Sequence, residues 1–595
     1  MSTFERIRQI QIKLLRLFYK LDAPADLYLM LLAALVGLLT GVGAYLLNLI
    51  VEGVHHGLFV EVGEKSFFQE YESLRIIFPA VGGLIVGLLT WKFSPEVKGH
   101  GIPGVMEAVA VKGGIIRKRV SVLTSINSGL TIGSGGSAGK EGPIVQIGAA
   151  IGSSIGQYLR VSQKRLKILV GCGAAAGLAA VFNAPIAGVL FSIEIILAAD
   201  FSLAVFTPIV ISSVIATAMA RYLVGSSPLF NIPSYSLASP AEYPFYLLMG
   251  ILGGVLSVLF IKTLYWVEDF FEDKLKLPAF VKPALGGLLA GLVAWKMPEL
   301  YGFDDSATYT ALTGAPDVWL LAGLMFAKIL ATSFTLGSGG TGGLFTPSLF
   351  IGAMFGALFG SLVGMFFPDS APAGAYALVG MGVIVAGTIH APLSAFLIIF
   401  EITRDYQIIL PLMLGTVTAT ITARWILKDS IYTMRISQIS KRVFGGRNKD
   451  VLERLTIGPF INKNPTVIYE HTPIEDIIKI MMQSSRSTFP VLNRARQVVG
   501  IITMRDLRPI IFEREVAPLL LATDIMSENV FVLEPQNSLG EALRKMEIDD
   551  YELLPVVESE KNMKFLGTIS RDEINRRYTK ENLLDNEWAG AGENE

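Results

Sequence analysis

Cysteine, histidine and charge are all scarce in this sequence of 595 residues. One cysteine, Cys172, and five histidines exclude a disulfide scaffold and a cysteine-based zinc site. Charged residues make up 17% of the chain, against about 25% in ordinary soluble domains. The net charge of −1 lacks the basic surplus that general nucleic-acid binding requires. No catalytic triad or paired carboxylates stand out, so we predict neither an enzyme nor a metal site, and no required cofactor.

Apolar residues and glycine are abundant instead, at 52% of the chain and 59 residues. Charge is uneven: residues 436–595 hold 46 of the charged residues and residues 1–435 hold 55, although the second stretch is far longer. This pattern predicts a polytopic α-helical membrane protein with a soluble C-terminal part. We expect a cytoplasmic amphipathic helix over 1–26, a membrane domain over 27–435 and a cytoplasmic α+β part over 436–595.

Basic residues flank the predicted membrane domain at both ends. Segments of this kind beside a membrane span tend to stay in the cytoplasm. We therefore predict that both termini are cytoplasmic in an integral protein of the plasma (inner) membrane. The residues concerned are Arg6, Arg8, Lys13, Arg16 and Lys20 before the first span, and Arg435, Lys441, Arg442, Arg447 and Lys449 after the last.

The membrane domain contains an internal duplication. Residues 79–92 recur at 283–296 with nine of fourteen positions identical, an offset of 204. The glycine-rich stretch 133–139 recurs at 337–343 with the same offset, and 183–194 recurs at 390–401 with an offset of 207. Ordered matches at nearly one offset predict two repeats, over about 27–225 and 240–435. The pattern by itself is compatible with parallel or inverted halves.

Three glycine- and proline-containing segments are typical of helix starts inside the membrane. They are 99–103, 139–143 and 343–347, each with a proline that suits the first turn. Free N–H groups at a helix N-terminus attract anions without a full positive charge, so convergent helix starts favour both anion binding and release. Glu141 lies within the second segment, two residues after Gly139. Its carboxylate would compete with a permeant anion for such N–H groups.

These segments, together with Ser430-Ile-Tyr432, resemble motifs of the CLC chloride channels and proton-coupled chloride exchangers, and they occur in the same order along the chain. The resemblance covers nearly the whole chain, and its Gly-Lys-Glu-Gly-Pro element at 139–143 is specific. It implies a CLC-like inverted repeat with broken helices, and a homodimer with one anion pathway in each subunit. It also implies that Glu141 is the gate. The anion-binding set that it implies is Gly99, His100, Gly101, Ile102, Pro103, Gly139, Lys140, Glu141, Gly142, Gly343, Leu344, Phe345, Thr346 and Tyr432.

Two positions depart from the family pattern. Coupled exchangers commonly carry a proton-transfer glutamate directly after the position of Glu194, where this chain has Ile195. An isoleucine carries no proton, which favours a passive channel, although Glu194 itself is an alternative carrier. His100 replaces the usual Ser or Pro, so the preferred anion stays open. Glu194 and Glu401 are repeat mates, and we expect them to share a structural role at helix ends.

The C-terminal part is itself doubled, over about 452–515 and 518–580. Residues 489–506 and 554–573 match in pattern, and both resemble CBS domains. In such pairs an adenine nucleotide often lies between the modules, so the resemblance implies a site for ATP, ADP or AMP. A purely structural dimerisation module is the alternative. The residues implied for nucleotide contact are Thr503, Asp506, Ser570 and Glu573.

The predicted function is therefore chloride or small-anion transport through a glutamate-gated pathway, with a passive channel favoured over a proton-coupled exchanger. Protons are partners only in the exchanger. A membrane-anchored nucleotide sensor is an alternative of another class, but an anchor needs neither the duplicated loops nor Glu141. A cation channel would require acidic rings along its pore, and the repeated segments offer N–H groups instead.

Overall fold

The computed structural model divides into two compact units, Met1–Ile436 and Ser437–Glu595. It describes residues 27–62, 75–93, 101–110, 112–225, 235, 237, 239–301, 306–314, 317–435, 437, 455–484, 487–507, 520–528, 530–548, 551–571 and 573–574. The predicted N-terminal helix over 1–26 lies outside the described residues, as do Gly99 and His100.

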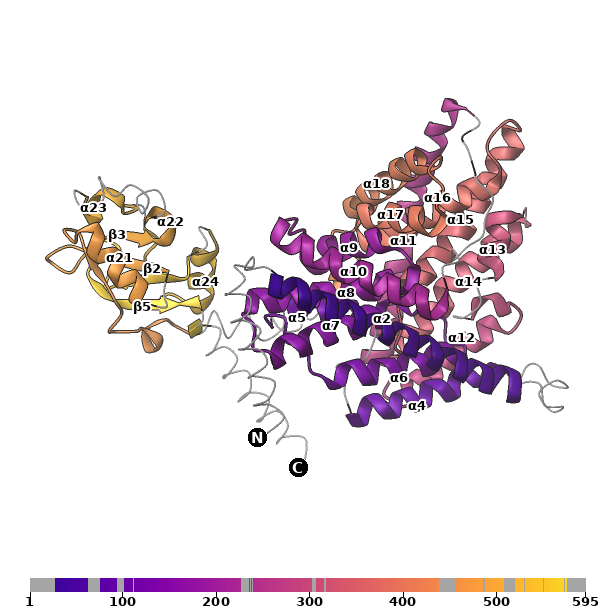
Figure 1. Cartoon of the computed structure of the whole chain (residues 1–595), viewed down its shortest axis with the longest axis horizontal. Helices are drawn as coiled ribbons and strands as arrows, with labels where there is room; N and C mark the ends of the chain where they lie inside the picture. The colour runs from indigo at the N-terminus through magenta and orange to yellow at the C-terminus, as the bar shows by residue number, and fades with distance from the viewer. Residues whose placement is uncertain are drawn as a thin grey trace. The chain divides into compact units, whose positions relative to one another are not determined.

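The first unit is helical and consists of two matching series (Figure 1). The first series comprises α2 (Leu27–His55), the π-helix η1 (His56–Val62), α4 (Ile77–Phe93), α5 (Ile102–Ala110), α6 (Arg119–Gly133), α7 (Glu141–Tyr158), α8 (Gln163–Phe182), α9 (Pro185–Phe191), the π-helix η4 (Ser192–Ile196) and α10 (Leu203–Val224). The second comprises η5 (Pro240–Glu242), α11 (Tyr243–Asp269), η6 (Phe270–Lys274), α12 (Lys282–Ala294), η7 (Pro298–Leu300), α13 (Ser306–Thr313), α14 (Val318–Gly337), α15 (Phe345–Phe366), α16 (Ala373–Ile389), α17 (Pro392–Thr403) and α18 (Ile409–Ile426).

Equivalent helices of the two halves pack against each other in antiparallel directions. Gly83 of α4 lies against Pro283, and Gly87, one turn later, lies against Phe280. Residue numbers therefore increase along α4 while those of its contacts decrease, so the two helices are antiparallel. The helices α9 and α17 also lie side by side (Figure 1). Reciprocal antiparallel contacts require a two-fold axis across the helices, so the halves are inverted.

Helix ends repeat in detail between the halves. The helices α8 and α16 end at Asn183 and His390, which both adopt the left-handed conformation with φ of 54° and 58°. Asparagine tolerates this conformation well, and the repeat places histidine in the same C-cap role. A proline then opens the next helix in each half, at Pro185 and Pro392.

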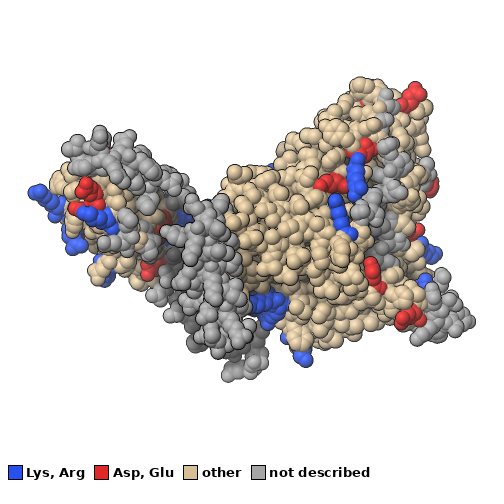
Figure 2. Space-filling model, viewed as in Figure 1, with Lys and Arg blue, Asp and Glu red and all other residues tan. Residues whose placement is uncertain are grey.

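The surface of this unit suits a lipid environment. Among the described residues, seven helical segments are long and apolar enough to cross a membrane, and others such as α4 and α17 are shorter. Figure 2 shows a broad uncharged area on the viewed face, with Lys, Arg, Asp and Glu gathered toward its edges. Short broken helices survive in a bilayer only where protein or a water-filled path satisfies their free backbone groups. Their ends are therefore the places to look for a transport site.

The second unit contains two copies of one α+β pattern. The first copy has β1 (Ile468–Tyr469), α21 (Ile474–Gln483), β2 (Thr488–Leu492), β3 (Val498–Thr503) and α22 (Met504–Leu507), and the second has α23 (Ala522–Ile525), α24 (Leu539–Ile548), β4 (Leu553–Val557) and β5 (Phe565–Ser570). The strands β2 and β3 are antiparallel, as are β4 and β5, and both pairs have a register shift near the same end. Leu492, Val557 and Phe565 belong to one apolar cluster, which joins the copies.

Candidate anion site

The two glycine-rich loops meet at the centre of the membrane unit. Gly139 and Gly343, which are repeat mates, exchange two backbone hydrogen bonds with N···O distances of 2.9 and 2.6 Å. A pair of equivalent residues bonded to each other lies on the two-fold axis itself. The loops therefore hold each other in place, and the helices that follow them, α7 and α15, begin on either side of this contact.

Buried hydroxyl groups fix each loop to the helix that precedes the loop of the other repeat. The Ser137 N–H donates to Thr335 Oγ1 at 3.1 Å, and the Thr341 N–H donates to Thr131 Oγ1 at 3.3 Å. The two bonds are equivalent, because Thr341 is the repeat mate of Ser137 and Thr335 is the repeat mate of Thr131, both at the offset of 204. This network was not predicted from the sequence. The recurrence of Ser or Thr at the repeat offset of 204 is the pattern that indicates it. Its effect is a rigid frame around the helix starts.

The starts of α7 and α15 lack side-chain caps from their own N-cap residues. The helices α7, α15 and α5 begin at Glu141, Phe345 and Ile102, as the glycine and proline spacing predicts. Neither Lys140 nor Leu344, the N-cap residues of α7 and α15, provides a side-chain cap. Their first-turn N–H groups therefore need another acceptor.

The acceptor at the start of α15 is the carboxylate of Glu141. This side chain is fully buried. Its Oε1 accepts hydrogen bonds from the backbone N–H groups of Phe345 and Thr346 at 2.7 and 3.0 Å. Its Oε2 accepts one from Thr346 Oγ1 at 2.8 Å. The glutamate from one repeat thus occupies the helix start of the other, and Phe345, its own repeat mate, carries no charge.

Tyr432 provides a hydroxyl beside this arrangement. Its side chain is 1% exposed and within electrostatic reach of the Glu141 carboxylate, and its hydroxyl has no hydrogen-bond partner among the described residues. Tyr265 Oη donates to the carbonyl of the preceding residue, Ile431, at 2.6 Å and so holds the segment. An unpaired buried hydroxyl is costly, and a bound anion would accept its proton in a hydrogen bond.

The start of α5 approaches the same region. Gly101 has φ of +77°, and a Cβ atom at this position would lie 3.0 Å from the carbonyl oxygen of Gly142. Glycine is therefore required both by the backbone conformation and by the close approach to α7. Ile102 and Pro103 follow, and both are buried. Of the predicted anion-binding set, Gly139, Gly142, Gly343, Leu344 and Phe345 are also buried, and Lys140 and Thr346 are partly exposed.

Comparison with known proteins decides the family. The family model described as voltage gated chloride channel matches residues 82–424, more than half of the chain. The chain belongs to the CLC family. CBS domain models match residues 457–513 and 522–580, so this CLC protein carries a C-terminal CBS pair.

Individual relatives of this CLC protein include plant and bacterial chloride channels. Chloride channel protein CLC-f of Arabidopsis thaliana is 30% identical over 662 residues, covering 93% of this chain and 82% of that protein. The voltage-gated ClC-type chloride channel ClcB of Escherichia coli O9:H4 is 32% identical over 370 residues, covering 62% and 88%. CLC-type chloride transport is therefore the general function of the chain, and the resemblance seen in its sequence is confirmed.

Solved structures of similar fold include transporters. A slow cyanobacterial Cl−/H+ antiporter has a TM-score of 0.62 at 27% identity, covering 69% of this chain and 97% of that one. A eukaryotic CLC transporter has a TM-score of 0.64 at 21% identity, covering 92% and 98%. The second likeness extends over most of the chain and shows the fold.

Glu194 and Glu401 of this CLC protein form reciprocal caps between the repeats. Glu194 Oε2 accepts hydrogen bonds from Ser394 N and Oγ at 2.9 and 2.6 Å, at the start of α17. Glu401 accepts from the N–H groups of Ile186 and Ala187 at 3.1 and 2.7 Å, at the start of α9. Each carboxylate therefore satisfies the first turn of the other repeat's helix. This is the shared structural role at helix ends that the duplication predicts.

The CBS residues predicted for nucleotide contact lie at equivalent strand ends. Thr503 ends β3, and both its N–H and its hydroxyl donate to Asp506 Oδ2, at 2.7 and 2.8 Å. Ser570 ends β5, and its Oγ accepts from the Glu573 N–H at 3.3 Å. The hydroxyl therefore binds the acid side chain in the first copy, and the backbone of the equivalent residue in the second. Among the described residues of the whole chain, no group of His, Cys, Asp and Glu side chains is arranged to hold a metal ion.

Proposed function

We propose that this CLC protein conducts chloride passively, through a pathway in which the Glu141 carboxylate is the gate. The observation that carries the proposal is the docking of this carboxylate on three donors at the start of α15. Those donors suit chloride equally well, because they offer partial positive charge without a fixed cation. The carboxylate and a chloride ion therefore compete for one place.

Gating then follows from the charge of Glu141. While the carboxylate is ionised, its bonds to Phe345 and Thr346 exclude chloride from the helix start. Protonation removes the negative charge and weakens these charge-assisted hydrogen bonds, so the side chain can leave. Chloride then accepts from the vacated donors, and the unpaired hydroxyl of Tyr432 is available to it. Binding without a full positive charge leaves release rapid.

The absence of a second proton carrier supports passive conduction over exchange. Ile195 stands where exchangers commonly carry a glutamate, and it is buried and apolar. The neighbouring Glu194 is held by two hydrogen bonds from Ser394. A carboxylate committed to capping α17 is a poor proton shuttle, since protonation would weaken the cap. The alternative remains a proton-coupled exchanger. It is favoured by the similarity to the solved structure of a cyanobacterial Cl−/H+ antiporter.

Proteoliposomes separate these proposals. We expect a chloride gradient to drive no uphill proton movement, and the reversal potential to follow chloride alone. Chloride flux without potassium flux would also exclude a cation channel and a membrane-anchored sensor. Stoichiometric uphill proton transport would instead establish exchange. In that case loss of the proton component in Glu194→Gln would identify Glu194 as the carrier.

We further propose a homodimer with one pathway in each subunit, formed through the face of α9, α10, α17 and α18. Exposed apolar side chains cover this face, among them Ile186, Val214 and Trp425. Polar groups interrupt it: Arg221 Nε donates to Asn183 Oδ1 at 2.6 Å, close to Glu401. Ionised groups facing lipid are costly, whereas a second subunit would shield them. For the same membrane domain we propose cytoplasmic termini, which the basic flanking segments support, and a location in the plasma (inner) membrane.

For the CBS pair we propose regulation by ATP, ADP or AMP at Thr503, Asp506, Ser570 and Glu573. Asp506 uses one carboxylate oxygen in its local cap, so its other oxygen is available to accept ribose hydroxyls. We expect nucleotide to raise the unfolding temperature of the full chain. At 100 times the dissociation constant, a ligand adds about 2.7 kcal/mol to stability.

Asp506→Asn keeps the local hydroxyl pairing and should weaken this stabilisation, because a neutral amide is a poorer acceptor for ribose hydroxyls. An exposed acid of the same unit, Glu558, provides the control as Glu558→Gln. If millimolar nucleotide leaves the unfolding temperature unchanged, the CBS pair is a structural dimerisation module instead.

A further inference from the structure

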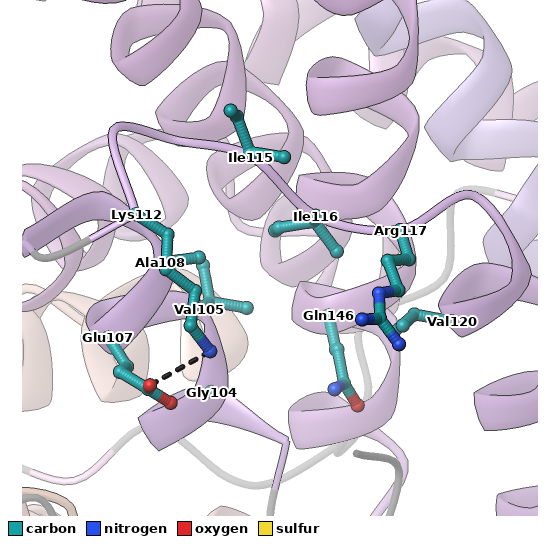
Figure 3. Close-up of a pocket in the computed structure, with 10 residues that line it drawn as sticks. All are labelled: Gly104, Val105, Glu107, Ala108, Lys112, Ile115, Ile116, Arg117, Val120 and Gln146. Atoms are coloured by element: carbon teal, nitrogen blue, oxygen red, sulfur yellow. Dashed lines mark ion pairs between the residues drawn. The ribbon is translucent and has the colours of Figure 1, made fainter. Parts of the chain in front are cut away.

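A pocket of about 370 Å³ lies between α5, α6 and α7 (Figure 3). One side carries Lys112 and Glu107, joined by an ion pair of 2.8 Å. Gln146 and Arg117 lie on the other side, and apolar residues such as Val105 form the wall between them. The pocket thus combines two cations and one anion with an apolar lining.

The loop over this pocket is fastened to the gate helix. The Ile116 N–H donates to Ser153 Oγ at 2.9 Å, and Ser153 Oγ donates to the Gly114 carbonyl at 2.6 Å. Gln157 Nε2 donates to the Ile116 carbonyl at 2.9 Å. Ser153 and Gln157 belong to α7, whose first residue is Glu141. Because Gln146, which lines the pocket, is also part of α7, a ligand in the pocket touches the helix that carries the gate.

Gln146 reaches into the pocket with an unused donor. It is 4% exposed, and its Oε1 accepts a hydrogen bond from Thr124 Oγ1 at 3.0 Å. Within the described chain its Nε2 has no hydrogen-bond partner. This nitrogen belongs to a pocket-lining side chain, so it can donate to a ligand oxygen in the pocket. The donors lining the pocket, Lys112, Arg117 and Gln146, all suit an oxyanion.

The surroundings are basic and border on lipid. Residues 112–119 and 160–167 together contain eight Lys and Arg and no Asp or Glu. The two segments are adjacent, since a Cβ atom at Gly113 would meet the side chain of Gln163. Beside them Ile115 and Val122 are 56% and 61% exposed, as expected for side chains against acyl chains. A basic pocket between membrane-spanning helices is a setting in which acidic lipid headgroups bind.

We propose that this pocket binds the phosphate headgroup of an anionic phospholipid. Lys112, Arg117 and the Gln146 amide would donate to the phosphate, and the acyl chains would lie along Ile115 and Val122. Because the bound lipid would contact both α5 and α7, its occupancy would bias the gate. That last step rests on the proposed function, whereas lipid binding itself does not.

Native mass spectrometry of the full chain with added phosphatidylglycerol tests the binding. The wild type should retain one phosphatidylglycerol more tightly than phosphatidylcholine. In Lys112→Gln/Arg117→Gln we expect about thirtyfold weaker retention, which is about 1 kcal/mol for each cation converted at 1.4 kcal/mol per factor of ten. The control Lys164→Gln/Arg165→Gln removes the same charge from the same basic face but leaves the pocket lining intact, and should retain the lipid.

Other results would overturn the proposal. Equal weakening in the two double variants would show general attraction to the basic face and no site. Inorganic phosphate or glycerol phosphate that displaces phosphatidylglycerol at similar concentration would identify a soluble phosphate compound as the ligand. If the double variant fails to fold, Arg117→Gln alone provides the test, with Arg165→Gln as its control. Chloride flux in vesicles with and without phosphatidylglycerol is measured separately, so lipid retention without any chloride conduction would count only against the proposed function.

Discussion

Glu141→Gln is expected to raise chloride flux about tenfold at neutral pH and to remove most of its pH dependence. Hydrogen bonds to a charged group are worth about 1.5–3 kcal/mol, and losing the lower value corresponds to about a factor of ten. The neutral amide can still accept from Phe345 N and Thr346 N but competes less well with chloride. Wild-type flux should rise as the pH falls, because protonation neutralises the gate, whereas the glutamine variant is neutral throughout.

The matched control for the gate is Glu242→Gln. Glu242 is another buried carboxylate of the membrane unit, and it also accepts from another element: from the Ala371 N–H and Tyr376 Oη, each at 3.2 Å. Its replacement should lower stability without changing the pH dependence of flux. Unchanged flux and pH response in a folded Glu141→Gln protein would remove Glu141 from the pathway.

Gly356→Ala is expected to prevent stable folding of the membrane unit. The helices α15 and α16 pack so closely that a Cβ atom at Gly356 would collide with the carbonyl oxygen of Tyr376 and lie 2.7 Å from the Cα of Ala377. Both obstacles are backbone atoms, so relief requires the two helices to separate. Overpacking a core typically costs about 1–3 kcal/mol of stability. We expect the cost of a collision with backbone atoms to reach or exceed the upper value of this range. Thermal unfolding followed by size-exclusion chromatography measures the loss.

The chain supplies both a control and a repetition of this experiment. Gly364 lies on the same helix and would meet nothing within 4 Å, so Gly364→Ala should leave stability unchanged or raise it by about 1 kcal/mol. Gly152 is the repeat mate of Gly356, and its Cβ atom would collide with the Leu169 carbonyl between α7 and α8. Gly152→Ala should therefore fail as Gly356→Ala does. Equal stability of the Gly356 and Gly364 variants would contradict the close packing.

Local patterns in the sequence were sufficient for the elements and their duplication. A proline in the first turn limits where a helix begins, so 139–143 and 343–347 predicted the starts of α7 and α15 within a residue or two. The recurrence at an offset of 204 predicted two halves, because identical local sequences form identical local structures. The shared capping role of Glu194 and Glu401 also followed, since repeat mates occupy equivalent places.

Only the tertiary structure decided which groups these elements bring together. The sequence pattern was compatible with parallel or inverted halves, and the antiparallel contacts of α4 with α12 settled it. The sequence placed Glu141 at the start of α7, yet its carboxylate binds the start of α15, 204 residues away. Likewise, the partner of Glu194 is Ser394, in the opposite repeat. Such pairings depend on how two folded halves face each other across an axis, and this is a property of long-range packing that no local run of residues encodes.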